Sequence, residues 1–581
     1  MKKCLLSALA VCLLAGSAAR SFAQDDAEAE MKPLFVASLR NYQELLDDLD
    51  FVGKVSGNDE MGKGIEGLIQ LVTQGQGLVS LDKSKPWGFA VNTDGVSFQI
   101  IGFLPISDLE KFMGAISGVA GEPEKDENGV WHVELQGQSL AMKQHKEWTF
   151  ASMGAEFLEN LPDDPTKYLS GLNDNYDGAV RIYIQNIPEI FRQLAIEQLK
   201  IGLEQGLTGE GGMQIPGLDN LPGGGQLPGA DSLPKLDEDQ QKLAAAIARE
   251  QLDAMAAMLD EVEQVTFGVT IDREKGMTLG DLTVSAISGS EAAADMAKMS
   301  DGKSRFAGFK NVDEAALKGV VSLNLTENDI TQMKDLLATV QEELNVRVDN
   351  FNLGDEHIKD LLKGFVEKLM DINRKTAESG KTDLGFALKG KGPFTLLLGS
   401  YVSDDSAATK LLDELVDTVE NEAGFYGIEK NVVEHKGVKF SRVLLPIPPG
   451  DEGDALSGLF GYDLELVIGI GPKSVYVGLG TNSLDGLKKA IDDSEESASE
   501  AVSPVEIVAK LAPLVKVAAE GQKDNPNAAL LAQALDGSKD TLTITMKPAP
   551  NGMNIHFEGE EGVLKLIGTM IAQMGPALPQ L

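Results

Sequence analysis

The chain has 581 residues, with 90 acidic and 51 basic side chains and a formal net charge of −39. A field of that sign repels phosphate backbones and anionic lipid surfaces, so the composition argues against nucleic-acid binding. Both cysteines, Cys4 and Cys12, lie near the N-terminus. If that segment is removed, the mature chain has no disulfide, cysteine nucleophile, thiolate metal site or iron–sulfur cluster.

The first 23 residues have the pattern of a secretory signal peptide. Lys2 and Lys3 provide the positive start, and an apolar run of residues 4–16 follows. This run is too short to span a bilayer, which takes about 20 residues. Small residues at positions −3 and −1, the second of them Ala23, predict cleavage before Gln24. We therefore expect a secreted or periplasmic chain of 48 basic and 90 acidic residues, without a transmembrane segment.

A pattern of strand, helix, helix, hairpin and helix recurs along the chain. It can be traced at residues 34–117, 179–299 and 319–423, and a shortened copy is at residues 505–572. Side chains that cap helix N-termini also fit, because asparagine and serine accept hydrogen bonds from the first turn. The periodicity predicts an α+β fold in which antiparallel hairpins and sheets are covered by helices on one face.

Three of these helix caps are predicted from single residues. Asn41 precedes the first helix of the first copy, Ser107 precedes the last helix of that copy, and Ser290 precedes the last helix of the second copy. Both residue types have a short polar side chain that can accept from a backbone N–H two or three positions on.

A larger period of half a chain is also visible. A β-rich insert at residues 122–160 lies between the first and second copies, and a similar one lies between the third and fourth. We therefore predict two homologous α+β halves, residues 30–300 and 305–575, which together hold about four related units. The competing interpretation is that any α+β chain looks periodic by eye.

The hairpins carry the most specific match between copies. The tripeptide Gly-Phe-Ala opens one hairpin at Gly88 and another at Gly385, and a second glycine, Gly102 or Gly399, follows each 14 residues later. With the signal peptide and the duplicated layout, these hairpins make the chain resemble large exported bacterial proteins of unknown function with diverged α+β repeats. The resemblance implies no catalytic residues.

One segment, residues 206–236, breaks this organisation. It is rich in glycine and proline, and Leu-Pro-Gly recurs in it every six residues. Such a sequence forms neither a helix nor an inner strand, so we predict a disordered or extended loop within the first half. A docking motif for a partner protein is the alternative.

One candidate metal site can be named. Asn173, Asn175 and Asp177 offer oxygen ligands at alternate positions before Gly178, as calcium loops do. The twelfth position of such a loop should be a glutamate and is Ile184. An Asn/Asp turn that leads into a strand is therefore the competing interpretation. No other cofactor is expected.

Other chemistry has little support in the sequence. Residues 57–64 resemble a P-loop, but Gly64 stands where the motif needs Ser or Thr to hold magnesium. No Gly-x-Ser-x-Gly elbow is present, and the five histidines have no metal-binding spacing. Carboxylate pairs cannot be selected from 90 acidic residues without a structure.

These observations favour an exported, non-enzymatic binding or scaffolding protein of the bacterial periplasm or cell envelope, because repeats extend a surface more often than they form a catalytic cleft. Two alternatives stay open. Small residues and methionines at 243–259 are typical of adaptable apolar pockets, which suggests a carrier of a lipid-like ligand between sheet and helices. A hydrolase with dispersed carboxylates is the other. The expected partner is an unknown protein or an apolar ligand.

Overall fold

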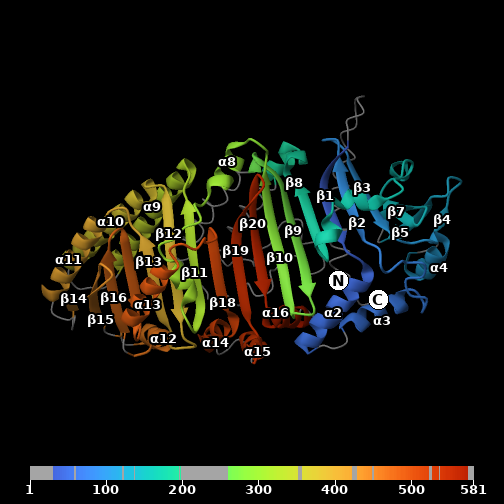
Figure 1. Ribbon diagram of the computed structural model, residues 1–581. Coiled ribbons are helices and arrows are strands. Elements are labelled where there is room, and N and C mark those ends of the chain that lie inside the picture. The colour runs from blue at the N-terminus through green and yellow to red at the C-terminus, as the bar shows by residue number, and fades with distance from the viewer. Residues whose placement is uncertain are drawn as a thin grey trace. The chain divides into compact units, whose positions relative to one another are not determined.

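The structure is a computed structural model with an α+β fold of antiparallel strands and helices (Figure 1). The signal peptide predicted at 1–23, the loop predicted at 206–236 and all but the last residue of the segment 243–259 lie outside the described residues. No helix within the described part of the chain is long and apolar enough to cross a membrane. The structure describes residues 31–57, 61–120, 123–135, 138–194, 197, 259–350, 356–421, 428–445, 447, 450–462, 464–521, 526–535 and 537–573.

The chain divides into two compact units, and each is described by itself. Unit 1 comprises residues 1–231, 258–287 and 558–581, and unit 2 comprises residues 232–257 and 288–557. Unit 1 therefore takes its last helix from the end of the chain. The contiguous halves predicted from the sequence stay a prediction.

Unit 1 is built on an antiparallel sheet. Its strands are β1 (Lys32–Leu39), β2 (Trp87–Thr93), β3 (Phe98–Leu104), β4 (Glu124–Lys125), β5 (Trp131–Leu135), β6 (Gln138–His145), β7 (Trp148–Ser152), β8 (Gly178–Tyr183), β9 (Val262–Asp272) and β10 (Met277–Ala286). Neighbouring strands follow the order β10, β9, β8, β1, β2, β3, β7, β6, β5, β4. Its helices are α2 (Tyr42–Ser56), α3 (Met61–Val72), α4 (Leu109–Ala120), α5 (Leu172–Asn175) and α16 (Glu561–Gln573), with 3-10 turns η2 (Ala155–Leu158), η3 (Pro165–Leu169) and η4 (Ile184–Asn186).

One face of this sheet is buried, and it is called the dry face below. Val36, Ala90 and Ile101 pair across β1, β2 and β3, and none of them is more than 3% exposed. Successive side chains of a strand point to opposite faces, so these three residues lie on the same face. The cluster that covers them includes side chains of η2, η3 and α5: Leu158, Leu169 and Leu172.

Unit 2 is built in the same way. Its strands are β11 (Ala315–Asn324), β12 (Lys381–Lys389), β13 (Thr395–Tyr401), β14 (Ile428–His435), β15 (Val438–Leu445), β16 (Leu464–Gly471), β17 (Ser474–Leu479), β18 (Val505–Lys510), β19 (Thr541–Ala549) and β20 (Gly552–Gly559), whose last two residues belong to unit 1. The order is β20, β19, β18, β11, β12, β13, β17, β16, β15, β14. Its helices are α8 (Glu291–Lys298), α9 (Glu327–Asn350), α10 (Glu356–Glu378), α11 (Asp405–Asn421), α12 (Asp451–Phe460), α13 (Ser483–Glu496), α14 (Leu511–Gly521) and α15 (Pro526–Ala534), with the 3-10 turn η6 (Ala307–Asn311).

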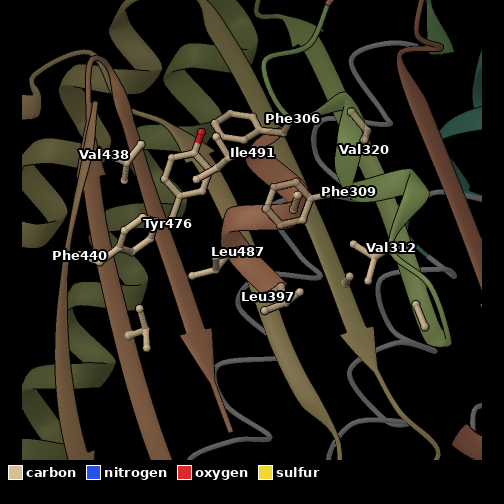
Figure 2. Packing of buried hydrophobic residues seen from close by; sticks show 14 residues of the cluster. Phe306, Phe309, Val312, Val320, Leu397, Val438, Phe440, Tyr476, Leu487 and Ile491 are labelled. Atoms are coloured by element: carbon tan, nitrogen blue, oxygen red, sulfur yellow. The ribbon is translucent and has the colours of Figure 1, made fainter. Parts of the chain in front are cut away.

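Aromatic rings fill the core of unit 2 (Figure 2). Phe306 and Phe309, at η6, are fully buried and meet edge to face with their ring centroids 6.2 Å apart. Tyr476 of β17 lies 5.6 Å from Phe306, and Leu487 of α13 is buried in the same cluster. The cluster therefore joins η6 and α13 to the sheet.

Helices lie on both faces of the unit 2 sheet, so the expectation of covering on one face is wrong here. On one face, α13 packs closely on β13, since a Cβ at Gly486 would lie 2.9 Å from Leu397. On the other face, Val475 packs against a cluster that includes Ile372 of α10 and Leu411 of α11. Val475 lies three residues before Gly478, the partner of Leu397, so the two positions are on opposite faces.

The glycines of the two Gly-Phe-Ala hairpins lie where a side chain would collide with the core. A Cβ at Gly88 would lie 2.2 Å from the carbonyl oxygen of Ala37 and 2.7 Å from Leu169. A Cβ at Gly385 would lie 2.6 Å from both Phe306 and Phe309. In both sheets, close approach to the strand explains why the residue before phenylalanine is glycine.

The second glycine of each hairpin, Gly102 or Gly399, has the same sequence spacing from the first glycine but a different partner across the hairpin. Gly399 pairs with Gly385, whereas Gly102 pairs with Phe89. The return strands therefore differ by one residue in register.

Substitution of Gly88 by alanine should lower the free energy of unfolding of unit 1 by about 1–3 kcal/mol, because the core must shift to admit the methyl group. All three tryptophans, at positions 87, 131 and 148, belong to unit 1, so urea unfolding followed by tryptophan fluorescence reports this unit. The matched control is Gly114→Ala in α4, where a Cβ meets nothing within 4 Å. It should stabilise the helix by about 0.5–1 kcal/mol. Equal effects of the two changes would contradict the packing argument.

Candidate functional site

Among the described residues, a concentration of interacting charges begins at the N-terminus of α2. The Asn41 side chain accepts a hydrogen bond of 2.8 Å from the backbone N–H of Glu44, which confirms the predicted cap and fixes where the helix begins. Glu44, Asp47 and Asp48 are then spaced i, i+3 and i+4, so they lie on one side of the helix.

Arg273, in the turn between β9 and β10, contacts all three of these carboxylates. Its guanidinium pairs with Glu44, lies 2.9 Å from Asp47 Oδ2, and places Nε 3.5 Å from Asp48 Oδ1. One planar cation thus connects the first two turns of α2 to a hairpin that lies more than 200 residues away in the sequence.

Asp48 is the buried member of this cluster. Its side chain is 8% exposed, and its Oδ1 atom has no hydrogen-bond partner, since the approach of Arg273 is an ion-pair contact only. The pKa of Asp48 is raised to about 7, first by burial and then by repulsion from Asp177, with Arg273 opposing both effects. Glu44 and Asp47 also raise this pKa.

Asp177, just before β8, adds a fourth carboxylate. Its Oδ1 lies 3.0 Å from Arg40 Nη1, and its Oδ2 accepts a hydrogen bond of 2.8 Å from the backbone N–H of Ile271. Arg40 also donates to the backbone carbonyls of Asn173 and Asp174. The cluster of Glu44, Asp47, Asp48, Asp177, Arg40 and Arg273 is called the carboxylate–arginine cluster below.

The candidate calcium ligands lie beside this cluster with their groups engaged in local contacts. Asn173 and Asn175 are in the short helix α5, where the Asn175 amide donates to the carbonyl of Gly171 over 3.0 Å. The Asn173 amide donates to the Asp174 carboxylate over 3.0 Å, and Asp177 pairs with Arg40. These contacts are those of a polar turn that leads into β8, and the calcium hypothesis stays a prediction.

A polar cleft of about 320 Å³ lies elsewhere in unit 1, beside the start of α4. Trp131 lines it, and Lys125 Nζ lies 5.3 Å from a ring centroid of this indole. Gln144 also lines it, but its side chain accepts from the backbone N–H of Leu109 and donates to the carbonyl of Ser107. These amide contacts fix the start of α4.

Three histidines have carboxylate partners that the sequence did not indicate. His435 lies 2.8 Å from Asp492, His145 lies 2.9 Å from Asp163, and His132 lies 3.4 Å from Asp126. Within the described residues, no group of three or more His, Cys, Asp or Glu side chains is arranged to hold a metal ion.

The second face of the unit 1 sheet is apolar and unevenly covered, since Val91 on this face is buried. Phe267 pairs with Val180, Val180 pairs with Ala37, and Ala37 pairs with Phe89, so all four residues lie on this face. Phe267 is 45% exposed, in contrast to the dry face. This half-buried surface is called the aromatic face below.

Aromatic pairs extend along the aromatic face. Phe35 stacks on Phe89 with ring centroids 5.5 Å apart, and Phe98 meets Phe191 edge to face at 5.7 Å. Phe35 and Phe98 are both half-buried. The strands thus carry large apolar side chains on a face that is not sealed like its opposite.

No family model and no curated protein sequence matches the chain. A solved structure described as crystal form IV of TP0453 is 12% identical over 44% of this chain and 82% of its own, with a TM-score of 0.21. A score that low establishes no common fold.

The sequence did not point to Arg273. The only signal was the spacing of the three acidic residues on α2, which requires a cation from elsewhere in the fold if the inner carboxylate is buried.

Replacement of Arg273 by glutamine should lower the free energy of unfolding of unit 1 by about 1–3 kcal/mol at pH 8, because the carboxylates then repel one another without a counter-charge. Tryptophan fluorescence in urea measures the change. The control is Lys111→Gln, which removes an exposed i,i+3 pair with Asp108 and should cost less than about 1 kcal/mol. An Arg273→Gln change as mild as the control would contradict the contacts given to Arg273.

The calcium hypothesis makes a separate prediction. Millimolar Ca²⁺ should raise the midpoint of thermal unfolding of the mature chain, and Asp177→Asn should abolish the increase, because binding to the folded state alone is stabilising. Asp163→Asn removes an exposed carboxylate elsewhere in unit 1 and should leave any increase unchanged. The absence of an increase in the unmodified chain would reject calcium at this turn.

Proposed function

We propose that the protein is an exported, non-enzymatic binding or scaffolding protein of the bacterial periplasm or cell envelope. The signal pattern at residues 1–23 supports export, and the remainder, which has no cysteine, must fold without a disulfide. The observation that carries a binding role is the repetition of one strand order in both units, because duplicated units extend a surface.

The repetition supports descent of the two halves, residues 30–300 and 305–575, from one ancestor. Strands β1 to β10 and β11 to β20 follow one order, and each strand matches the strand ten numbers later. Phe89 pairs with Ala37, which pairs with Val180, and Phe386 pairs with Gly319, which pairs with Ile507. Both Gly-Phe-Ala motifs thus occupy one register position.

The element order also supports the prediction of about four related repeats, which are the copies traced in the sequence. A strand, two helices, a hairpin and a helix follow one another from β1 to α4, from β11 to α11 and from β18 to α16. The unit that begins at β8 has the same hairpin and last helix, β9, β10 and α8. Ser290 caps α8 through a hydrogen bond from Ala293, as predicted.

Export predicts a defined N-terminus. The mature protein recovered from the periplasmic fraction or medium of its native cells should begin at Gln24, because signal peptidase cleaves after small residues. Intact-mass spectrometry measures this directly. Recovery of an uncleaved chain in the cytoplasm would reject the localisation.

A carrier of an apolar, lipid-like ligand is the second candidate, and the aromatic face favours it. Val36 and Ile101 on the dry face are at most 3% exposed, whereas Phe267 on the aromatic face is 45% exposed. Partly covered aromatic and aliphatic side chains are the usual lining of sites for apolar ligands.

The carrier hypothesis predicts that a fluorescent fatty acid binds the delipidated mature chain and that Phe267→Ser weakens binding severalfold. Tyr462→Ser is the matched control, because Tyr462 is an aromatic residue of unit 2 that is 84% exposed. Organic extraction and mass spectrometry of the native protein test for a resident lipid. If binding is absent, or if both variants weaken it equally, the carrier hypothesis is rejected and the scaffolding hypothesis is retained.

The carboxylate-dependent hydrolase stays a third hypothesis. Its best candidate pair is Asp48 and Asp177. The pKa of Asp48 is raised and Asp177 is a nearby charge, as in enzymes where one carboxyl is the general acid and the other stays ionised. Each of these carboxylates, however, lies within ion-pair distance of an arginine. This arrangement supports a structural role more than a catalytic one.

A further inference from the structure

The carboxylate–arginine cluster has more negative than positive groups. Four carboxylates, those of Glu44, Asp47, Asp48 and Asp177, contact two guanidiniums. Three of the four have a close arginine partner, and Asp48 has only the 3.5 Å contact with Arg273 Nε. An ionised carboxylate at that place loses its hydration without an equivalent hydrogen bond in return.

The Oδ1 atom of Asp48 marks where the missing charge belongs. It is buried and has no hydrogen-bond partner, and it points toward Arg273 among the other acids. Buried polar atoms in folded proteins are normally satisfied, so an orphaned oxygen inside a negative cluster indicates a bound positive species. The smallest such species is a proton.

We infer that the folded protein holds a proton on Asp48, and that this proton tightens the junction of α2 with the β9–β10 turn at mildly acidic pH and leaves it as the pH rises through neutrality. The inference concerns the pH response of unit 1 and does not depend on the proposed binding function.

The charged groups that face Asp48 come from three elements. Glu44 and Asp47 are on α2 itself, Arg273 is on the β9–β10 turn, and Asp177 precedes β8 with Arg40 as its partner. Repulsion by the three acids favours the protonated form of Asp48, and Arg273 favours the ionised form.

The other helices that pack on α2 do so further along it. α3 contacts it where the backbone N–H of Gly62 donates to Asp50, and α16 contacts it where Gly568 lies against Ser56. The charges at the start of α16, Glu561 and Lys565, pair with each other. Glu66 of α3 pairs with Lys83.

The direction of the pH effect follows from linkage. The pKa of Asp48 is about 7 in the folded protein against 3.8 for the free side chain. Between these values the folded state binds one more proton than the unfolded state, so stability falls as pH rises and levels off above the folded pKa. One proton changes the unfolding constant by a factor of about ten per pH unit in this window.

The junction also affects the C-terminal helix. α16 packs on α2, which Arg273 contacts, and on β10, the strand that follows the turn that holds Arg273. If the junction loosens above neutral pH, the packing of α16 on α2 and β10 should therefore also become less stable.

The test is urea unfolding of the mature chain at pH 5, 6, 7, 8 and 9, followed by the tryptophans of unit 1. The ratio of unfolding constants of the unmodified chain and Asp48→Asn should rise about tenfold per pH unit from pH 5 to near 7, and then level off. Other titrating groups cancel in this ratio. Asp47→Asn is the matched control, and its ratio should change much less with pH.

Two outcomes would overturn the inference. One is a ratio for Asp48→Asn that does not change with pH, and the other is a ratio for Asp47→Asn that changes as much. If Asp48→Asn does not fold, Asp177→Asn provides the test, because loss of a neighbouring negative charge lowers the pKa of Asp48. The pH at which stability levels off should then move down, and an unmoved value would reject the inference.

Discussion

The structure depends on the sealing of one face of each antiparallel sheet. In unit 1 the row Val36, Ala90 and Ile101 is covered by short turns that follow β7, and in unit 2 the phenylalanines at η6 fill the same role. Sealing requires the covering groups to approach the backbone closely, and Gly88 and Gly385 permit that approach. The opposite faces differ, since in unit 2 Val475 packs against buried side chains of α10 and α11, whereas in unit 1 Phe267 is 45% exposed.

Charge imposes a second constraint, because a chain with 90 acidic residues cannot place all of them in water far from one another. Most acidic side chains that pair do so at the surface, where an ion pair contributes little to stability. The carboxylate–arginine cluster is different, since Asp48 is buried there. The cost of burying it falls on the junction between α2 and the β9–β10 turn, and this cost makes that junction sensitive to pH.

Local signals in the sequence predicted local structure well. Asn41 and Ser290 cap the helices expected of them, because a cap depends on residues only three positions apart. The cap predicted at Ser107 is wrong by one residue, since the backbone N–H of Lys111 donates to the side chain of Asp108 at the start of α4. The α+β class follows from patterns of similar range. The sequence does not predict contacts between residues that are far apart in the chain and that the order of the strands brings together. Arg273 meets Glu44 at a separation of 229 residues, and no periodicity connects them.

The same limit explains the wrong expectation that helices cover one face only. Strands β12, β13, β16 and β17 read as hairpins with apolar residues at many positions, which fits burial on one face or on two. Only the packing of α13 on one side and of α10 and α11 on the other distinguishes these possibilities. Equal glycine spacing was also misleading, because Gly102 and Gly399 differ in their pairing.

A comparison of the two units at one backbone position shows that the charges differ where the backbone hydrogen bond is the same. In unit 1 the backbone N–H of Arg40 donates to the carbonyl of Asp177 over 2.9 Å, and in unit 2 the N–H of Ser322 donates to the carbonyl of Pro504 over 2.8 Å. The two hydrogen bonds follow matched strand pairs, β1 with β8 and β11 with β18. The backbone contact is kept, but the ion pair is replaced by two uncharged side chains. Proline cannot raise the pKa of a neighbouring carboxylate and serine cannot neutralise one, so the electrostatics that favour a proton on Asp48 have no counterpart at this position of unit 2.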